Sequence, residues 1–216
     1  MVLTAALAVL LSGCEWLRPF EEVCENRLGP TIIDVVATPI SHGVDLGKST
    51  AELTAMGAPS TGRQVLGLTQ TSLKWSASYG SRGLTRRPGS RHCMRPAISV
   101  KLSFEPMTVF VGREQAEGSC AFNITMDHER RHVRVYERFL DEVAPRMQAA
   151  LAAHFGNRIF YFDSEAEAER HVQASLRDFL APLVDNSMKD VAQRQAAVDT
   201  PEEYFRLDGF QQACSS

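Results

Sequence analysis

The sequence has no excess of charge of either sign, no internal repeat and no low-complexity tract. Its 26 acidic and 23 basic residues leave a formal net charge of −3. No stretch interleaves aromatic and basic side chains, so nucleic acid is not an expected partner. Hydrophobic residues make up 44% and charged residues 23% of the 216 positions, an ordinary globular composition that argues against disorder. The length suits one sizeable domain or two small lobes.

Long hydrophobic runs are also absent, apart from residues 2–11. This run is too short to span a bilayer as a helix but long enough for the core of a signal peptide. It ends in Leu11-Ser12-Gly13-Cys14, which resembles a bacterial lipobox, although no lysine or arginine precedes it. The resemblance implies a signal peptide over residues 1–13, lipid attachment at Cys14 and a linker over residues 14–30. The protein would then be lipid-anchored in the bacterial cell envelope, facing the periplasm or the cell exterior. The alternative is an unprocessed apolar segment that packs on the domain.

Cysteine is scarce, and none of its five occurrences forms a C-x-x-C pair. Apart from Cys14 there are four, an even number that suits two disulfides in an oxidising compartment: Cys24, Cys93, Cys120 and Cys214. Of the three possible pairings we favour Cys93 with Cys120 and Cys24 with Cys214, the second of which would fasten the two ends together. The alternative is four buried free thiols.

Histidine occurs six times, yet two histidines stand four positions apart in Asp127-His128-Glu129-Arg130-Arg131-His132. In a helix this interval is about one turn and places both imidazoles on one face. The pattern is H-E-x-x-H, in which His128 and His132 would bind zinc and Glu129 would act as general base. Apolar residues at helical spacing from Ile124 to Met147 support a helix here. The alternative is a surface helix with two partly buried, hydrogen-bonded histidines.

The region from residue 31 to 118 is predicted to be mainly β-stranded. A β-branched run indicates a strand at residues 31–37, and alternating apolar residues indicate two strand pairs, 64–70 with 72–79 and 97–104 with 107–112. Between these pairs, residues 80–92 are typical of a basic loop. We therefore expect a small antiparallel sheet in this half of the chain.

The region from residue 119 to 216 is predicted to be mainly helical. The motif helix should run over residues 120–154, and a second helix should begin after Ser164; a shorter one is expected earlier, after Ser49. Residues 198–214 are expected to be less regular. The expected fold class is α+β, a single domain over residues 31–216 in which the antiparallel sheet precedes the helical part that carries H-E-x-x-H.

Three stretches together resemble a known bacterial family. They are Gly43-Val44-Asp45-Leu46-Gly47-Lys48-Ser49 followed by Glu52-Leu53, the strand at residues 73–79 with Trp75, and Gly118-Ser119-Cys120-Ala121-Phe122 running into the motif. The similarity covers about residues 35–199. The family is catalogued as a domain of unknown function and described as predicted secreted zinc-dependent proteases. The resemblance implies a zincin-like fold with Zn²⁺ as cofactor.

A catalytic zinc usually has three protein ligands and one open position, and the motif supplies two. Members of the family carry a late aspartate followed by threonine, and Asp199-Thr200 stands at the comparable place. The resemblance thus implies Asp199 as third ligand. Asp199 and Thr200 before Pro201 are also typical of a helix N-terminus. His171 and Glu169 are alternative ligands, in that order.

These observations lead to a zinc-dependent peptidase or amide hydrolase of the cell envelope, acting on a peptide or protein substrate with Glu129 as general base. The alternative function, from another class, is a noncatalytic envelope lipoprotein. Such a protein would use the sheet or the basic loop of a zincin-like scaffold to bind a partner, and it would bind zinc weakly or not at all.

Overall fold

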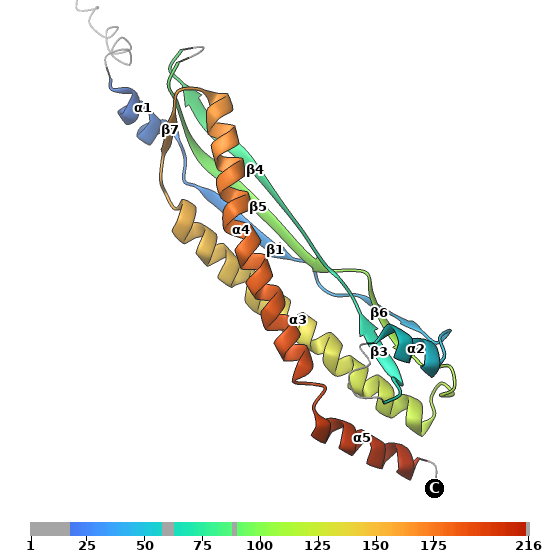
Figure 1. The fold of residues 1–216 in the computed structure, drawn as a ribbon. Coiled ribbons are helices and arrows are strands. Elements are labelled where there is room, and N and C mark those ends of the chain that lie inside the picture. The colour runs from blue at the N-terminus through green and yellow to red at the C-terminus, as the bar shows by residue number, and fades with distance from the viewer. Residues whose placement is uncertain (1–17, 58–62, 88–89, 215–216) are drawn as a thin grey trace, which may run out of the picture.

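The computed structural model describes residues 18–57, 63–87 and 90–214, so Cys14 and the expected signal peptide lie outside the described residues. The molecule is elongated, with two long helices laid along a narrow arrangement of strands (Figure 1). The helices are α1 (Phe20–Arg27), α2 (Thr50–Met56), α3 (Cys120–Phe155), α4 (Glu165–Ala196) and α5 (Pro201–Ala213). The strands are β1 (Ile32–Ala37), β2 (His42–Asp45), β3 (Gly67–Gln70), β4 (Leu73–Thr85), β5 (His92–Phe104), β6 (Met107–Val111) and β7 (Phe160–Phe162).

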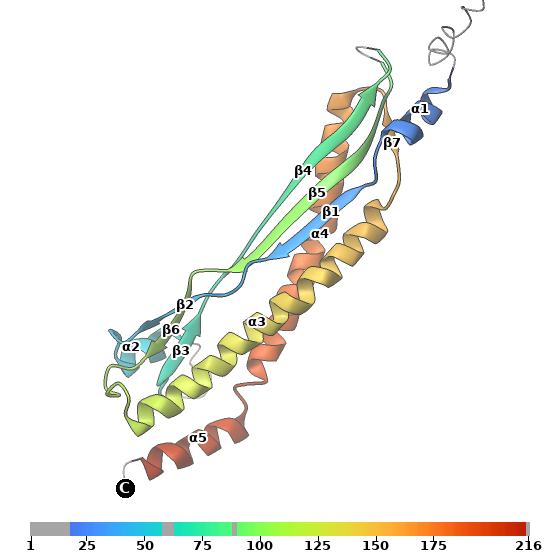
Figure 2. The same ribbon diagram turned by 180° about the vertical axis from the view of Figure 1, so that it is seen from behind.

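The strands form two sheets that follow one another along the molecule, as Figure 2 shows from behind. The first has the order β1-β5-β4, with β7 paired to β5, and the second has the order β2-β6-β3. In each sheet one outer strand is parallel and the other antiparallel to the central strand. Three chain segments, β1–β2, β3–β4 and β5–β6, therefore each contribute a strand to both sheets. The α+β class is as expected, but the sheets are mixed and not antiparallel.

The predicted strand pairs are wrong because the short breaks between them do not reverse the chain. Residues 71–72 join β3 to β4, and Glu105-Pro106, with a cis peptide bond, joins β5 to β6. The two breaks lie side by side, since the amide of Glu105 donates to the carbonyl of Ser72. The predicted basic loop is also shorter than expected, because β4 continues to Thr85 and β5 begins at His92. The true reversal lies between these two strands.

The main core lies between one face of the strands and the two long helices, and it includes Met107, Val109 and Val111 of β6 in the second sheet. Alternate residues of β5 are buried, among them Ile98, Val100 and Leu102, which is the period expected when one face of a strand is covered. The helix α3 packs against β1 and β5, and α4 packs against β4 and β5. Each fully buried aliphatic or aromatic side chain contributes about 1.5–3 kcal/mol. This packing fixes α3 along the sheet, and with it the motif.

The helix ends follow the capping patterns closely. Ser49 and Glu52 form a capping box at the start of α2, and Ser164 caps α4 by accepting from the amide of Glu167. The closing segment was expected to be irregular, but α5 is a helix capped by Thr200 with Pro201 in its first turn. None of the helices in the described part of the chain is long and apolar enough to cross a membrane.

Two disulfides join Cys24 to Cys93 and Cys120 to Cys214, so the pairing that we favoured is wrong. The reason is that β5 and β6 lie between Cys93 and Cys120, and about 20 extended residues span about 60 Å. The two cysteines therefore stand toward opposite ends of the molecule. The bond at Cys24 holds α1 on the end of β5, where the sequence predicted a linker.

Candidate metal centre

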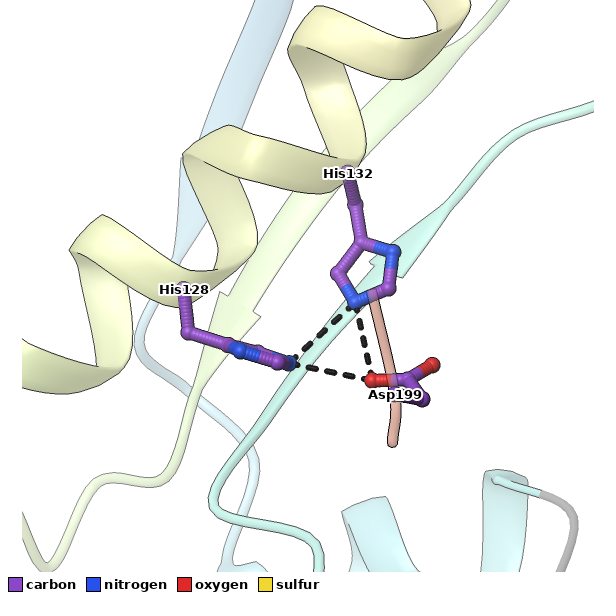
Figure 3. Close-up of side chains that lie close together, drawn as sticks. All are labelled: His128, His132 and Asp199. Carbon is purple, nitrogen blue, oxygen red and sulfur yellow. Dashed lines mark hydrogen bonds and ion pairs between the residues drawn. The ribbon is translucent and has the colours of Figure 1, made fainter. Parts of the chain in front are cut away.

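The candidate centre is formed by α3, β3 and the turn between α4 and α5. His128, Glu129 and His132 lie in the N-terminal half of α3, and β3 packs against the same helix. Asp199 lies between the end of α4 and the N-cap of α5. Figure 3 shows the imidazoles of His128 and His132 directed toward the carboxylate of Asp199.

The three side chains bring their ligand atoms together in a small triangle. Nε2 of His128 lies 3.1 Å from Oδ1 of Asp199, and Nε2 of His132 lies 3.2 Å from the same oxygen. The two Nε2 atoms are 3.2 Å apart. Among the described residues, His128, His132 and Asp199 form the one group of histidine, cysteine or acidic side chains close enough to share a metal ion.

The triangle suits tetrahedral zinc. Zinc bonds of about 2.0–2.1 Å at tetrahedral angles place ligand atoms about 3.3 Å apart, and the three edges here are 3.1, 3.2 and 3.2 Å. Two imidazoles and a carboxylate are also an established donor set for a zinc site with an open fourth position. The residues present therefore fit the metal that the motif implies.

The structure separates the two roles that the sequence allowed at Asp199-Thr200, because Thr200 is the N-cap of α5 while Asp199 lies in the candidate centre. The hydroxyl of Thr200 accepts from the amide of Glu203 and caps α5. This leaves the carboxylate of Asp199 free to point toward α3. The alternatives lie elsewhere: Glu169 and His171 are exposed in the first turns of α4, and His171 contacts the rings of Phe160 and Phe162. About 25 helical residues, or about 38 Å, separate them from Asp199.

The second nitrogen of each imidazole also has neighbours. Nδ1 of His132 lies 2.6 Å from Oε1 of Gln195, and the amide of Gln195 donates to the carbonyl of His132. Nδ1 of His128 lies 2.9 Å from Nη2 of Arg131 and 3.6 Å from Oε1 of Glu203. Such contacts orient the rings and set which nitrogen carries the proton.

Glu129 is held against β3 and is only 3% exposed. Its Oε2 accepts a hydrogen bond of 2.7 Å from the hydroxyl of Thr69. A Cβ at Gly67 would lie 2.8 Å from Oε1 of Glu129 and 2.6 Å from Cγ2 of Thr125, so only glycine lets the strand come this close. Burial raises the pKa of Glu129, and the charge of His132 and the Thr69 hydrogen bond offset this in part.

The carboxylate of Asp199 and the imidazole of His132 each shift the pKa of the other toward its charged form. Burial alone would raise the pKa of Asp199, but its hydrogen bonds with His128 and His132 outweigh burial and hold the pKa well below the usual range. Burial would lower the pKa of His132, yet the bond with Asp199 and the charge of Glu129 raise it. The hydroxyl of Tyr204 donates to Oδ1 of Asp199 at 3.0 Å. Burial, followed by the charge of Asp199, raises the pKa of that phenol.

No protein-family model, curated protein or solved structure matches this chain. The resemblance to the predicted secreted proteases therefore stays a prediction, and any function has to be argued from the site itself.

The centre opens into a cavity of about 410 Å³. Its walls come from β3 and the residues before it, from α3, and from α5. An ion pair between Arg63 and Asp208 joins the segment before β3 to α5, and the guanidinium of Arg63 lies 5.3 Å from the ring centre of Tyr204. A volume of this size is typical of a small-ligand site.

Sequence reasoning missed several residues that shape the centre, namely Gly67, Thr69, Gln195 and Glu203. Thr69 is 60 positions and Gln195 is 63 positions from its partner in α3. No local pattern marks such partners. Glu203 carried a signal only as the third residue after a capping threonine, which predicts a helix start and not a contact with His128.

Proposed function

We propose that this protein is a metal-dependent hydrolase of peptide or amide bonds in the bacterial cell envelope. The observation that carries the proposal is the meeting of His128, His132 and Asp199 beside the buried carboxyl of Glu129. The two disulfides support a location outside the cytoplasm. The lipid anchor at Cys14 belongs to the same proposal.

Zinc is the proposed cofactor, with His128, His132 and Asp199 as its ligands. When bound, zinc supplies a Lewis acid that polarises a carbonyl oxygen and lowers the pKa of a water to about 7. Glu129 is the proposed general base, which takes the proton from the attacking water and passes it to the leaving nitrogen. Its raised pKa favours this task, because a base works best when its pKa approaches the working pH.

The cavity that opens at the candidate centre, which we call the catalytic cleft, favours an extended peptide as substrate. The strand β3 is an outer strand of its sheet and lines the cavity with residues 67–69. An outer strand offers unpaired amide and carbonyl groups, to which an extended peptide can add by β-strand pairing. A peptide bound along β3 would pass directly over Glu129, which contacts the same strand.

We propose that the hydroxyl of Tyr204 stabilises the oxyanion that forms at the reacting carbonyl. Its hydroxyl donates to Asp199 and stays protonated because its pKa is raised. A neutral phenol at this place is a hydrogen-bond donor that could turn from the carboxylate to a developing oxyanion. Tyr204 also lines the cavity of the centre.

Metal content decides the first half of the proposal. Elemental analysis of the full-length protein should give close to one zinc per chain. His132→Ala and Asp199→Ala should each lose most of it, whereas His171→Ala should keep it. Absence of zinc after reconstitution, or full retention in His132→Ala, would overturn the metal site and favour the noncatalytic binding lipoprotein.

Catalysis decides the second half. Glu129→Gln should keep zinc, because Glu129 is not among the proposed ligands, and should lose about three orders of magnitude in the rate of cleavage of unstructured protein substrates. If Glu129→Gln bound zinc and cleaved substrates at the unchanged rate, the metal site would stand but the proposed role of Glu129 in hydrolysis would be wrong.

A further inference from the structure

A second cavity of about 500 Å³ lies on the other side of α5 from the catalytic cleft. We call it the arginine groove. The charged residues that line it are four arginines and two glutamates: Arg131, Arg134, Arg138, Arg206, Glu202 and Glu203. The turn between α4 and α5 forms its remaining wall, with Ala197, Val198 and Thr200.

The arginines are placed there by helical geometry. Arg131, Arg134 and Arg138 stand three and four positions apart on α3, so their side chains emerge on one face. Arg206 approaches from α5 and makes two hydrogen bonds, of 3.0 and 2.7 Å, to the carboxylate of Glu203. The guanidinium of Arg131 binds the same carboxylate. Glu203 is therefore already shared by two arginines.

The other two arginines have no such partner. Arg134 and Arg138 are exposed and form no ion pair or side-chain hydrogen bond with any residue in the ranges that the structure describes. Other arginines of the same helix do form ion pairs: Arg130 with Asp127, and Arg146 with Asp190. The arginine groove thus has two guanidinium groups available to a ligand.

The charge of the groove indicates the ligand. Four arginines and two glutamates leave a net charge of +2, and the N-terminus of the 13-residue helix α5 adds positive potential at Thr200. A phosphate monoester carries a charge of about −1.5 to −2 near neutral pH. Planar guanidinium groups bind its oxygens through paired hydrogen bonds. A single carboxylate would neutralise only half of this charge.

We propose that the arginine groove binds a phosphate monoester group, held chiefly by Arg134 and Arg138. The group could belong to free phosphate or to the headgroup of a lipid in a membrane other than the one that holds the proposed anchor at Cys14, and both offer the same chemistry. The inference does not depend on the proposed hydrolase, because the groove and the catalytic cleft lie on opposite sides of α5.

The test compares two double variants of the full-length protein. Arg134→Gln/Arg138→Gln removes the two available guanidinium groups, and Arg170→Gln/Arg177→Gln removes the same charge from exposed positions of α4. Binding of inorganic phosphate is measured by calorimetry at about 0.15 M salt. Binding to phosphatidylcholine vesicles with and without phosphatidic acid is measured by sedimentation.

We expect the groove variant to lose roughly tenfold or more in affinity, because it lacks both guanidinium groups that are available to pair with the phosphate oxygens, while the α4 variant stays within about twofold. Loss of phosphate binding identifies free phosphate as a ligand, and loss of only the binding that depends on phosphatidic acid identifies a headgroup. Arg134→Lys/Arg138→Lys should recover part of the affinity. Absence of saturable binding to either probe, or an equal loss in both glutamine variants, would overturn the proposal.

Discussion

Nδ1 of His128 lies beside a hydrogen-bond donor, the guanidinium of Arg131, whereas in a metal-binding imidazole this nitrogen carries a proton and needs an acceptor. A neutral histidine that binds metal through Nε2 carries its proton on Nδ1. The nearest neighbour of that Nδ1 is Arg131, at 2.9 Å, and a guanidinium has no acceptor atom. Glu203 is the nearest carboxylate, at 3.6 Å. We infer that metal binding transfers the Nδ1 contact from Arg131 to Glu203.

Glu203→Gln should therefore weaken zinc binding. Outer partners of metal-binding histidines commonly change affinity by about 10–100-fold, and we expect a loss in this range. Competition with a chromogenic chelator measures the affinity. Glu202→Gln, at the exposed neighbouring position, should leave it unchanged. Equal affinities of Glu203→Gln and the unmodified protein would show that Glu203 only pairs with arginines.

Glu129 should reduce the stability of the metal-free protein at neutral pH. Its folded pKa is raised above the ordinary value of 4.5, so the folded state binds the proton more tightly than the unfolded state. Stability is then lost as the pH rises from about 4.5 through the raised pKa.

Glu129→Gln should therefore raise the melting temperature of the chelator-treated protein at pH 7. A gain of about 1 kcal/mol corresponds to about 2–4 °C for a chain of this size. The gain should shrink toward pH 4, where the carboxyl is protonated in both states. Glu137→Gln, at an exposed site of α3, is the control. A gain independent of pH would contradict the argument.

At the scale of single elements, the approach of β3 to α3 sets the position of Glu129. Gly67→Ala would place a methyl group 2.6 Å from Thr125 and 2.8 Å from Glu129. We expect a loss of about 1–3 kcal/mol in the free energy of unfolding and slower hydrolysis, with zinc affinity unchanged because Glu129 is not among the proposed ligands.

Gly43→Ala is the matched control for this change. Gly43 lies in β2 of the same sheet, and a Cβ there meets nothing within 4 Å. Urea unfolding and cleavage rates of the two variants give the comparison. If Gly67→Ala matched Gly43→Ala in both, the close approach of β3 would have no part in positioning the carboxyl.

The elements that the sequence predicted well are those defined by local patterns. The motif helix, the capped starts of α2 and α4, and the strand predicted at residues 31–37, which is observed as Ile32–Ala37, agree with the structure. The predicted strand pairing was wrong because composition does not show whether a short break, such as residues 71–72 or Glu105-Pro106, reverses the chain or lets it continue in the same direction.

The candidate site also has a part that a local pattern predicts and a part that no local pattern predicts. His128 and His132 are fixed by one turn of helix, while Asp199 is 71 positions from His128 and no periodicity connects them.

At the scale of the whole molecule, the two disulfides stabilise different ends. The Cys24–Cys93 bond fastens α1, and the Cys120–Cys214 bond fastens α5 to the start of α3. No residue of α5, which lies wholly within the described residues, is buried. Polar contacts and this bond therefore hold the helix that positions Asp199 and Tyr204.

Cys120→Ser/Cys214→Ser should lower zinc affinity, because α5 detaches and Asp199 loses its position. Cys24→Ser/Cys93→Ser should keep the affinity even though each bond stabilises the fold by about 2–5 kcal/mol. Chelator competition measures zinc, and hydrogen exchange of α5 amides measures detachment. Equal zinc affinity of the two double variants would show that α5 stays in place without its disulfide.

The length of the molecule also determines how far the candidate centre lies from the N-terminal end. The helix α1 and the candidate centre stand at opposite ends (Figures 1 and 2), and the helix from His128 to Phe155 alone spans about 40 Å. If Cys14 carries the proposed anchor, α3 acts as a spacer that holds the cleft well clear of the bilayer. The cleft could then not reach peptide bonds inside the membrane. It could reach peptides that lie outside the membrane, at about the length of α3 from its surface.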